Sequence, residues 1–182
     1  GKPDIELVDL TSRLVTINEI MEVTTKPIIL DGDTGGREEH FVYNVRTLER
    51  LGVSAIIIED KTGLKKNSLF GTEVIQTLED PIIFAEKIRA GKRALTTRDF
   101  LIFARIESLI AGKDVKDAMM RAMIYVEAGA DGIMIHSKDK TGEDIFEFIR
   151  QFREFSEDIP IILVPTSYNQ FTEKELAEKG AN

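Results

Sequence analysis

The segment Ala55-Ile-Ile-Ile-Glu-Asp60 joins four apolar residues directly to two carboxylates. An apolar run of this length, rich in β-branched residues, is typical of a strand that is covered on both faces in a parallel sheet. The same arrangement recurs along the chain, and strands are expected at residues 27–31, 55–59, 100–105, 132–136 and 160–164. The sequence therefore predicts a parallel β-sheet.

Amphipathic segments alternate with the expected strands. Two of them carry helix-start signals, because Pro81 follows Asp80 at a first helical position and Thr172 precedes Glu175 with the spacing of a capping box. The expected helices cover residues 7–23, 37–51, 81–89, 115–128, 143–155 and 172–179. Helix follows strand throughout, so residues 1–182 are predicted to form a single α/β domain.

Polar residues follow every expected strand, and their placement decides between two α/β folds. They are Asp31, Glu59 and Asp60, Arg105 and Glu107, His136 and Ser137, and Thr166 and Ser167. In a doubly wound sheet only the strands at the switch point carry such groups, whereas in a (β/α)8 barrel all strand ends converge on one axis. The pattern favours a barrel of the TIM type, although a typical barrel needs about 250 residues.

The composition excludes several classes of protein. A formal net charge of -8 argues against a nucleic-acid surface, and the absence of cysteine excludes disulfides, zinc–thiolate centres and cysteine nucleophiles. No apolar run approaches the roughly 18 residues of a membrane helix, and the N-terminus does not read as a signal peptide. The cytoplasm is therefore the expected compartment. The first residue is glycine, which is expected of a processed, tagged or excised piece.

Three carboxylates belong to two consecutive strand ends: Asp31, Asp33 and Glu59. Asp31 and Asp33 are close enough to repel each other at the mouth of a buried strand, so a positive partner is expected beside them. Oxygen donors without histidine or cysteine suit magnesium or manganese. Ordinary acidic loop residues would also explain each carboxylate singly, but three on one face favour a metal.

Cationic and polar residues form a second group at the same strand ends. Arg105 ends an apolar strand, where a guanidinium without a partner would be costly. His136 ends the next strand, and a hydrogen-bonded core histidine would explain it as well. The loop after Glu59 carries Lys61, Lys65, Lys66, Asn67 and Ser68. A solvated charge run would explain the lysines. Together with a metal, these groups suit a substrate that carries a carboxylate or a phosphoryl group.

Three further features are assigned no catalytic role. The loop lacks the GxxxxGK(S/T) spacing, which excludes a nucleotide-binding P-loop. His40 is expected to be structural or on the surface. The pair Gly35-Gly36 is expected to supply positive φ angles for a tight turn after Asp33.

Four stretches resemble the phosphoenolpyruvate mutase family of the isocitrate lyase superfamily. They are DGDTGG at 31–36, EDKTGLKKNS at 59–68, ARIESLIAG at 104–112 and GADGIMIHSK at 129–138. The most specific part is EDK followed after five residues by NS, which separates the mutases from most relatives. The resemblance implies interconversion of phosphoenolpyruvate and 3-phosphonopyruvate, with Mg²⁺ as cofactor, a small-molecule substrate, and a homo-oligomer that is a dimer or a tetramer.

The resemblance also implies roles for individual residues. Asp31 is the direct magnesium ligand, while Asp33 and Glu59 act mostly through metal-bound water. Arg105 and His136 hold the carboxylate and the phosphoryl group of the substrate. A further active-site carboxylate is Asp4, and a gating loop that closes over the substrate contains Lys65, Asn67, Ser68 and Leu69. Composition alone would not single out Asp4.

Three alternatives to the mutase remain open. A phosphonopyruvate hydrolase would deliver the phosphoryl group to water, and Asn67 favours the mutase over it. An oxaloacetate-acting lyase is a second alternative, whereas the isocitrate and methylisocitrate lyases are rejected because their KKCGH motif needs a cysteine. An inactive fragment or scaffold is the third. The family barrel has two strands before Asp4, and an eighth strand with further helices after Asn182, so a partial barrel is expected.

Overall fold

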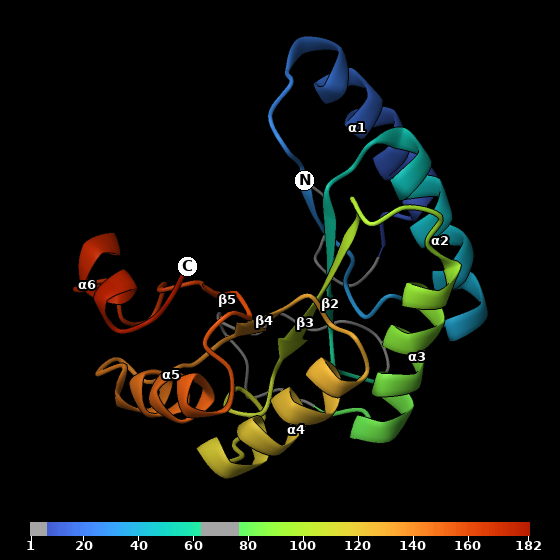
Figure 1. Ribbon diagram of the computed structural model, residues 1–182. Helices are drawn as coiled ribbons and strands as arrows, with labels where there is room; N and C mark the ends of the chain where they lie inside the picture. Colours follow the sequence, from blue (N-terminus) through green and yellow to red (C-terminus); the bar gives the residue numbers. More distant parts are fainter. Residues whose placement is uncertain (1–6, 63–76) are drawn as a thin grey trace.

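The computed structural model describes residues 7–62 and 77–182. Its strands form one parallel sheet in the order β1-β2-β3-β4-β5. They are β1 (Ile29–Asp31), β2 (Ala55–Glu59), β3 (Leu101–Ile106), β4 (Gly132–Ile135) and β5 (Ile161–Leu163). Because the spatial order follows the chain and never reverses, the sheet has no switch point of the doubly wound kind. The sheet is curved (Figure 1), and a curved parallel sheet with sequential strand order and helices on its outer side is the arrangement of a (β/α)8 barrel, as predicted.

Helices cover the convex side of the curved sheet (Figure 1). They are α1 (Leu10–Val23), α2 (Glu38–Leu51), α3 (Pro81–Ala94), α4 (Val115–Glu127), α5 (Glu143–Phe155) and α6 (Glu173–Glu178). Both predicted helix starts are confirmed: Asp80 accepts from the backbone N–H groups of Ile82 and Ile83 at the start of α3, and Thr172 forms a complete capping box at the start of α6. Among the residues described, no helix combines the length and apolar character needed to cross a membrane.

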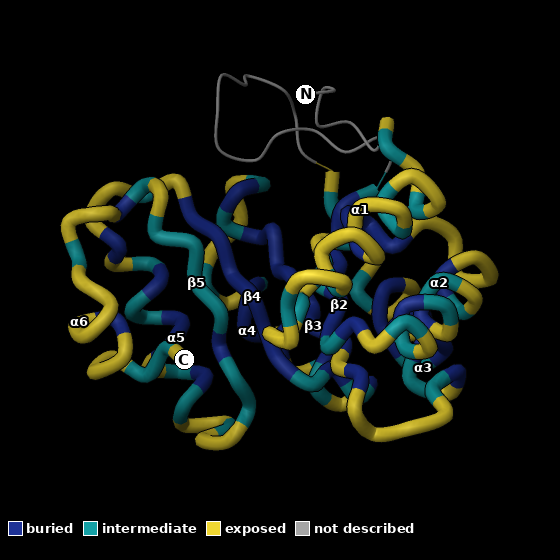
Figure 2. Tube along the Cα trace, turned by 90° about the horizontal axis from the view of Figure 1, so that it is seen from above, coloured by how far each residue is buried: buried dark blue, intermediate teal, exposed yellow. Residues whose placement is uncertain are grey.

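The two faces of the sheet bury different side chains. Ile58, Ala104 and Ile135 point to the convex side and belong to the core shared with the helices. The tube in Figure 2 shows the central strands largely buried and the outer parts of the helices exposed. Alternation along the strands turns their neighbours Glu59 and Arg105 to the concave side.

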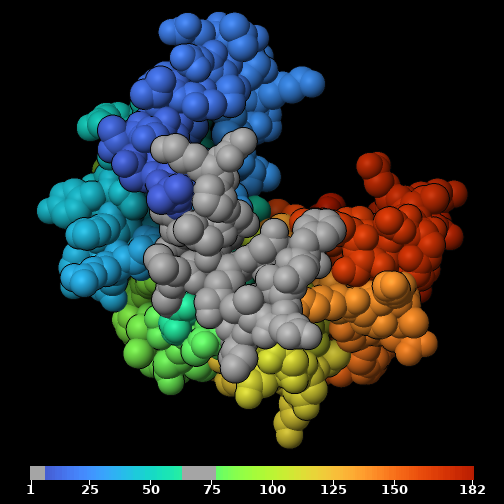
Figure 3. Space-filling model, turned by 180° about the vertical axis from the view of Figure 1, so that it is seen from behind, coloured from blue at the N-terminus to red at the C-terminus, as the bar shows by residue number. Residues whose placement is uncertain are grey.

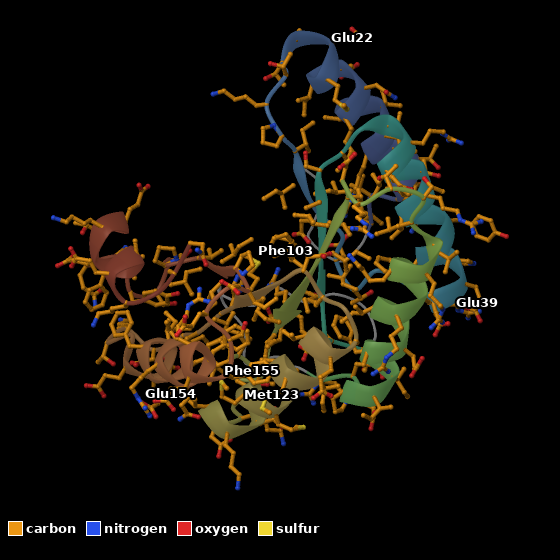
Figure 4. All side chains as sticks on the ribbon, in the orientation of Figure 1. Glu22, Glu39, Phe103, Met123, Glu154 and Phe155 are labelled. Atoms are coloured by element: carbon orange, nitrogen blue, oxygen red, sulfur yellow. The ribbon has the colours of Figure 1, made fainter. Side chains whose placement is uncertain are left out.

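The concave side carries the predicted site residues at one rim. Phe103 lies on this side (Figure 4), whereas Glu39 points outward from α2. The register pairs Glu59 with Arg105 across β2 and β3, and His136 directly follows β4. In the space-filling view of Figure 3, the N-terminal and C-terminal parts of the described chain lie apart at the two ends of the curve. The carboxyl ends of the strands therefore gather the candidate residues between these ends.

Helix α3 continues to Ala94, beyond the predicted end at residue 89. Gly91 lies inside the helix at a point of close approach. A Cβ atom added there would lie 2.5 Å from Cε1 of Phe41 on α2 and 2.9 Å from Cδ1 of Ile102 on β3. Glycine thus allows α3 to pack closely against both the sheet and its neighbouring helix.

Gly91→Ala is expected to lower the free energy of unfolding by about 1–3 kcal/mol, because the added methyl group overpacks this contact. The direction of the change is informative, because the same substitution at an open helix position would raise the free energy of unfolding by about 1 kcal/mol. Urea unfolding of the two proteins measures the change. Phe41→Leu in the Gly91→Ala background should restore part of the loss. A Gly91→Ala protein more stable than the wild type would contradict the close packing of α3.

Candidate active site

The loop from Asp31 to Gly36 leaves the carboxyl end of β1 in a tight turn. Asp31 Oδ1 accepts from the backbone N–H of Asp33 at 3.0 Å, and the carbonyl of Asp33 accepts from the N–H of Glu59 at 2.8 Å. Asp33 has a left-handed backbone with φ of 53°, and Gly35 and Gly36 follow with φ of 76° and 69°. The two glycines therefore supply the predicted turn, and the loop is bound to the end of β2.

The positive partner expected beside the two aspartates is Arg13 of α1. Its guanidinium forms an ion pair with the carboxylate of Asp33 and donates to the backbone carbonyl of Asp31 at 2.6 Å. The requirement for a cation near DGDTGG could not identify Arg13, because the chain contains 24 lysines and arginines. Only the placement of α1 in the folded chain, beside the carboxyl end of β1, selects it.

Four charged side chains at the ends of β2 and β3 form a closed ring of alternating sign, called the strand-end ring below. Arg105 Nη2 lies 3.2 Å from Glu59 Oε2, and Lys61 Nζ lies 3.4 Å from Glu59 Oε1. Lys61 Nζ also lies 3.4 Å from Glu107 Oε2, and Arg105 Nε donates to Glu107 Oε1 at 2.5 Å. All four residues are buried. Each carboxylate therefore meets both cations.

The ring settles two points that the sequence left open. Arg105 is paired on both sides, as a buried guanidinium requires. Burial lowers the pKa of Arg105, but the charges of Glu107 and Glu59 outweigh this effect and raise it above its ordinary value. Lys61 is only 4% exposed, so a solvated charge run does not explain it.

His136 lies next to the ring at the end of β4. Its Nδ1 atom is 3.5 Å from Glu107 Oε1, and neither ring nitrogen has a hydrogen-bond partner among the residues described. Burial, reinforced by the charge of Arg105, lowers the pKa of His136 to about 4, against the opposing effect of Glu107. The imidazole is therefore neutral at pH 7 and is not the hydrogen-bonded core histidine considered above.

Acid is expected to destabilise the protein through His136. A folded-state pKa of about 4 lies below the ordinary value of about 6.5, so the unfolded chain binds the proton more readily. The stability that the neutral His136 contributes is fully present above pH 6.5 and is lost as the pH falls toward 4. Between pH 7.5 and pH 5 the loss in the free energy of unfolding amounts to about 2 kcal/mol. Urea unfolding at the two pH values measures it by comparing the wild type with His136→Gln.

His40 provides the matched control, since it is the other of the two histidines and is exposed, as predicted. His40→Gln should keep the full pH dependence, whereas His136→Gln should lose that part of it. Equal pH dependence in all three proteins would show that His136 is not held neutral by the fold.

A second buried group lies behind the strand-end ring. Asp60 Oδ1 accepts from the backbone N–H of Glu107 at 2.9 Å, and Oδ2 accepts from the hydroxyl of Tyr125 at 2.7 Å and from Arg121 Nη1 at 3.1 Å. Burial raises the pKa of Asp60 above its ordinary value, although Tyr125 and Arg121 oppose the shift. These contacts tie the residues after β2 and β3 to α4. The sequence marked Asp60 only as a polar strand end, and nothing in it pointed to Arg121 or Tyr125.

The residues at this rim suit a magnesium ion held through few direct ligands. Asp31 is exposed at the rim, and Asp33 and Glu59 form ion pairs with Arg13 and Arg105. Within residues 7–62 and 77–182, no group of three or more histidine, aspartate or glutamate residues is arranged to hold a metal directly. Magnesium commonly takes one or two carboxylates and completes its shell with water. The donor set fits one direct bond from Asp31, and the assignment of the three carboxylates stays a prediction.

Five predicted site residues lie outside the described residues: Asp4, Lys65, Asn67, Ser68 and Leu69. The structure does describe the residues on both sides of 63–76. The N–H of Thr62 donates to the carbonyl of Thr77 at 2.9 Å, and Lys61 forms an antiparallel bridge with Leu78. The two ends of this segment therefore meet beside the strand-end ring.

Comparisons with known proteins agree with this geometry. A phosphonopyruvate hydrolase from Variovorax sp. is 38% identical over 178 residues, which cover 96% of this chain and 59% of the relative. The crystal structure of phosphoenolpyruvate phosphomutase from Streptomyces platensis subsp. rosaceus has a TM-score of 0.91 and 34% identity, and the match covers 100% of this chain and 62% of that one. A structure of phosphonopyruvate hydrolase in complex with oxalate and Mg²⁺ has a TM-score of 0.85 and 36% identity, covering 98% and 60%. Lyases also occur among the relatives.

The chain thus spans about three fifths of the length of these proteins, whose solved members share its fold. The relatives are enzymes that include mutases, a hydrolase and lyases. The family model described as phosphoenolpyruvate phosphomutase matches residues 1–182. The chain belongs to the phosphoenolpyruvate phosphomutase family.

Proposed function

We propose that the protein is a phosphoenolpyruvate phosphomutase, which interconverts phosphoenolpyruvate and 3-phosphonopyruvate. The observation that carries the proposal is the placement of Arg105, a member of the buried strand-end ring of balanced charge, beside His136 at the adjoining strand end. The substrate carries a carboxylate and a phosphoryl or phosphonyl group, and these two residues differ in a way that suits two different anions.

Arg105 supplies a permanent positive charge. Its guanidinium is fixed by Glu59 and Glu107 and stays protonated at any working pH. A planar guanidinium can bind a carboxylate or a phosphoryl group through two N–H donors. Because its position is fixed before the substrate arrives, the interaction needs little reorganisation during the reaction.

His136 supplies a neutral donor. Its pKa of about 4 leaves one ring nitrogen protonated and the other able to accept a hydrogen bond at pH 7. A neutral imidazole can donate to a phosphoryl oxygen without forming the tight ion pair that would resist movement of the group. This property suits a phosphoryl group that moves between carbon and oxygen, and Asn67 is proposed to hold the same group from the segment after β2.

Asp31 would hold magnesium, with Asp33 and Glu59 acting through water. When bound, the ion supplies a Lewis acid that stabilises negative charge on the enolate oxygen of pyruvate. A phosphomutase must also exclude water, because a loose, metaphosphate-like group would otherwise be hydrolysed. The proposed roles of Lys65, Asn67, Ser68 and Leu69 in a closing loop rest on the resemblance, as does the role of Asp4.

A phosphonopyruvate hydrolase is the second candidate, and the 38% identity with such an enzyme favours it. The EDK-to-NS spacing with Asn67 supports the mutase instead. An oxaloacetate-acting lyase and an inactive scaffold are less well supported, because neither accounts for that spacing. We further infer a cytoplasmic enzyme that acts as a dimer or a tetramer on a small-molecule substrate.

The yield of inorganic phosphate separates the two candidates. The purified protein is incubated with phosphonopyruvate and Mg²⁺, and the phosphate released is compared with the phosphonate consumed. A mutase consumes phosphonate and releases almost no phosphate, whereas a hydrolase releases one phosphate for each molecule consumed. No consumption of phosphonate would reject both.

A further inference from the structure

Glu107 is the least exposed member of the strand-end ring, with no accessible surface at all. Its Oε1 accepts from Arg105 Nε at 2.5 Å, and its Oε2 lies 3.4 Å from Lys61 Nζ. Its backbone N–H is fixed in turn by Asp60 at 2.9 Å. Asp60 thus fixes the backbone of Glu107, and the carboxylate of Glu107 fixes the positions of two cations. Because Glu107 is fully buried, it does not itself contact a ligand.

Glu59 contacts the same two cations, but its position differs. It ends β2 beside the loop of Asp31 and Asp33, and Asp33 accepts from its backbone N–H at 2.8 Å. If Glu59 turns to water bound by a metal at Asp31, its hold on Arg105 and Lys61 weakens. Glu107 is then the carboxylate that keeps both cations in place.

We propose that Glu107 is a positioning residue of the active site, which, with Lys61 beside it, holds Arg105 where it meets an anionic group of the substrate. The inference rests on the proposed function in one respect, the anionic nature of the ligand. It adds to that function a role for Glu107.

Electrostatics and positioning predict opposite effects when the charge of Glu107 is removed. Glu107→Gln leaves the ring with one excess positive charge, which by Coulomb attraction alone would tighten the binding of an anion. Gln also replaces one carboxylate oxygen with an amide donor, which cannot pair with Lys61. The loss of fixed geometry should outweigh the gain in charge, because a buried ion pair that loses one partner is strongly destabilised.

The test is the binding of oxalate in the presence of Mg²⁺, measured by isothermal titration calorimetry. We expect Glu107→Gln to weaken oxalate binding at least tenfold with unchanged stoichiometry. A partly unfolded protein would lower the stoichiometry and leave the Kd unchanged, so the two effects are separable. Tighter or unchanged binding would overturn the proposal, as would a wild type that fails to bind oxalate.

Asp131→Asn is the matched control. Like Glu107, Asp131 is a carboxylate that pairs with a cation: it lies 2.7 Å from Lys92 Nζ, and it accepts from the backbone N–H of Ile102 on β3 at 2.7 Å. It stands at the opposite end of the strand from the ring, so its loss should leave the Kd for oxalate within twofold of the wild type. An equal loss of affinity in both variants would overturn the positioning role and assign Glu107 a structural one.

Glu107→Asp keeps the test decisive if Glu107→Gln does not fold. It preserves the charge and shortens the side chain by one methylene, so it should still weaken oxalate binding at least threefold; unchanged affinity would overturn the proposal. Oxalate binding with no turnover of phosphonopyruvate would reject the proposed function while leaving the role of Glu107 intact.

Discussion

Replacing Asp31 with alanine is expected to lower magnesium-dependent turnover of phosphonopyruvate by at least about 10²-fold. The reason lies in how the three carboxylates of this rim are engaged. Asp33 pairs with Arg13, and Glu59 belongs to the strand-end ring. Neither can replace Asp31 as a direct ligand without breaking a buried or half-buried ion pair. Initial rates measured over a range of Mg²⁺ concentrations test the prediction.

Asp158→Ala controls for the loss of a carboxylate as such. Asp158 is exposed in the connection between α5 and β5, far along the chain from β1. Its replacement should leave the rate and its dependence on Mg²⁺ unchanged. A rate for Asp31→Ala within a few-fold of the wild type would refute the role assigned to Asp31.

Asp60→Ala is expected to lower the free energy of unfolding by about 3–5 kcal/mol. The variant removes the acceptor for three buried donors: the guanidinium of Arg121, the hydroxyl of Tyr125 and the N–H of Glu107. Arg121 keeps its ion pair with Asp117 at 3.0 Å, but it loses its fully buried partner, and this loss together with the two other unpaired donors accounts for the expected change. Urea or thermal unfolding, followed by circular dichroism, measures the change.

Tyr125→Phe tests the same network from its other side. It removes one donor, while Asp60 keeps Arg121 and the N–H of Glu107. The expected loss is therefore smaller, about 1 kcal/mol. As a control, Glu154→Ala breaks an exposed pair with Arg150 and should change stability little. Equal stability of Asp60→Ala and Tyr125→Phe would show that the charge of Asp60 is not what holds Arg121.

Much of the fold could be predicted because its determinants are local. Apolar runs such as the one beginning at Ala55 indicated the strands, and Asp80-Pro81 and Thr172 marked two helix starts that the structure confirms. The barrel was inferred from polar residues at successive strand ends, which a curved sheet with sequential strand order brings to one rim. The end of α3 was missed, because the place of Gly91 depends on Phe41 and Ile102, which are remote in sequence.

The candidate site was predictable only in part. Residue type and position at a strand end pointed to Asp31, Glu59, Arg105 and His136, but not to their partners. The pairing of Arg13 with Asp33 depends on where the folded chain places α1 relative to the loop after β1. Likewise, nothing local distinguishes the buried Lys61 from a solvated lysine, because its burial follows from the closed ring with Glu107.

Phosphorus NMR of phosphonopyruvate incubated with the protein and Mg²⁺ in ¹⁸O-labelled water tests the proposed phosphomutase reaction most directly. The account predicts that the phosphonate signal is replaced by that of phosphoenolpyruvate, with no ¹⁸O in its three non-bridging phosphoryl oxygens, because the phosphoryl group passes from carbon to oxygen without meeting water. The bridging oxygen is not counted, since it comes from the ketone of phosphonopyruvate, which exchanges with water. Inorganic phosphate that carries ¹⁸O would show hydrolysis and contradict the mutase assignment.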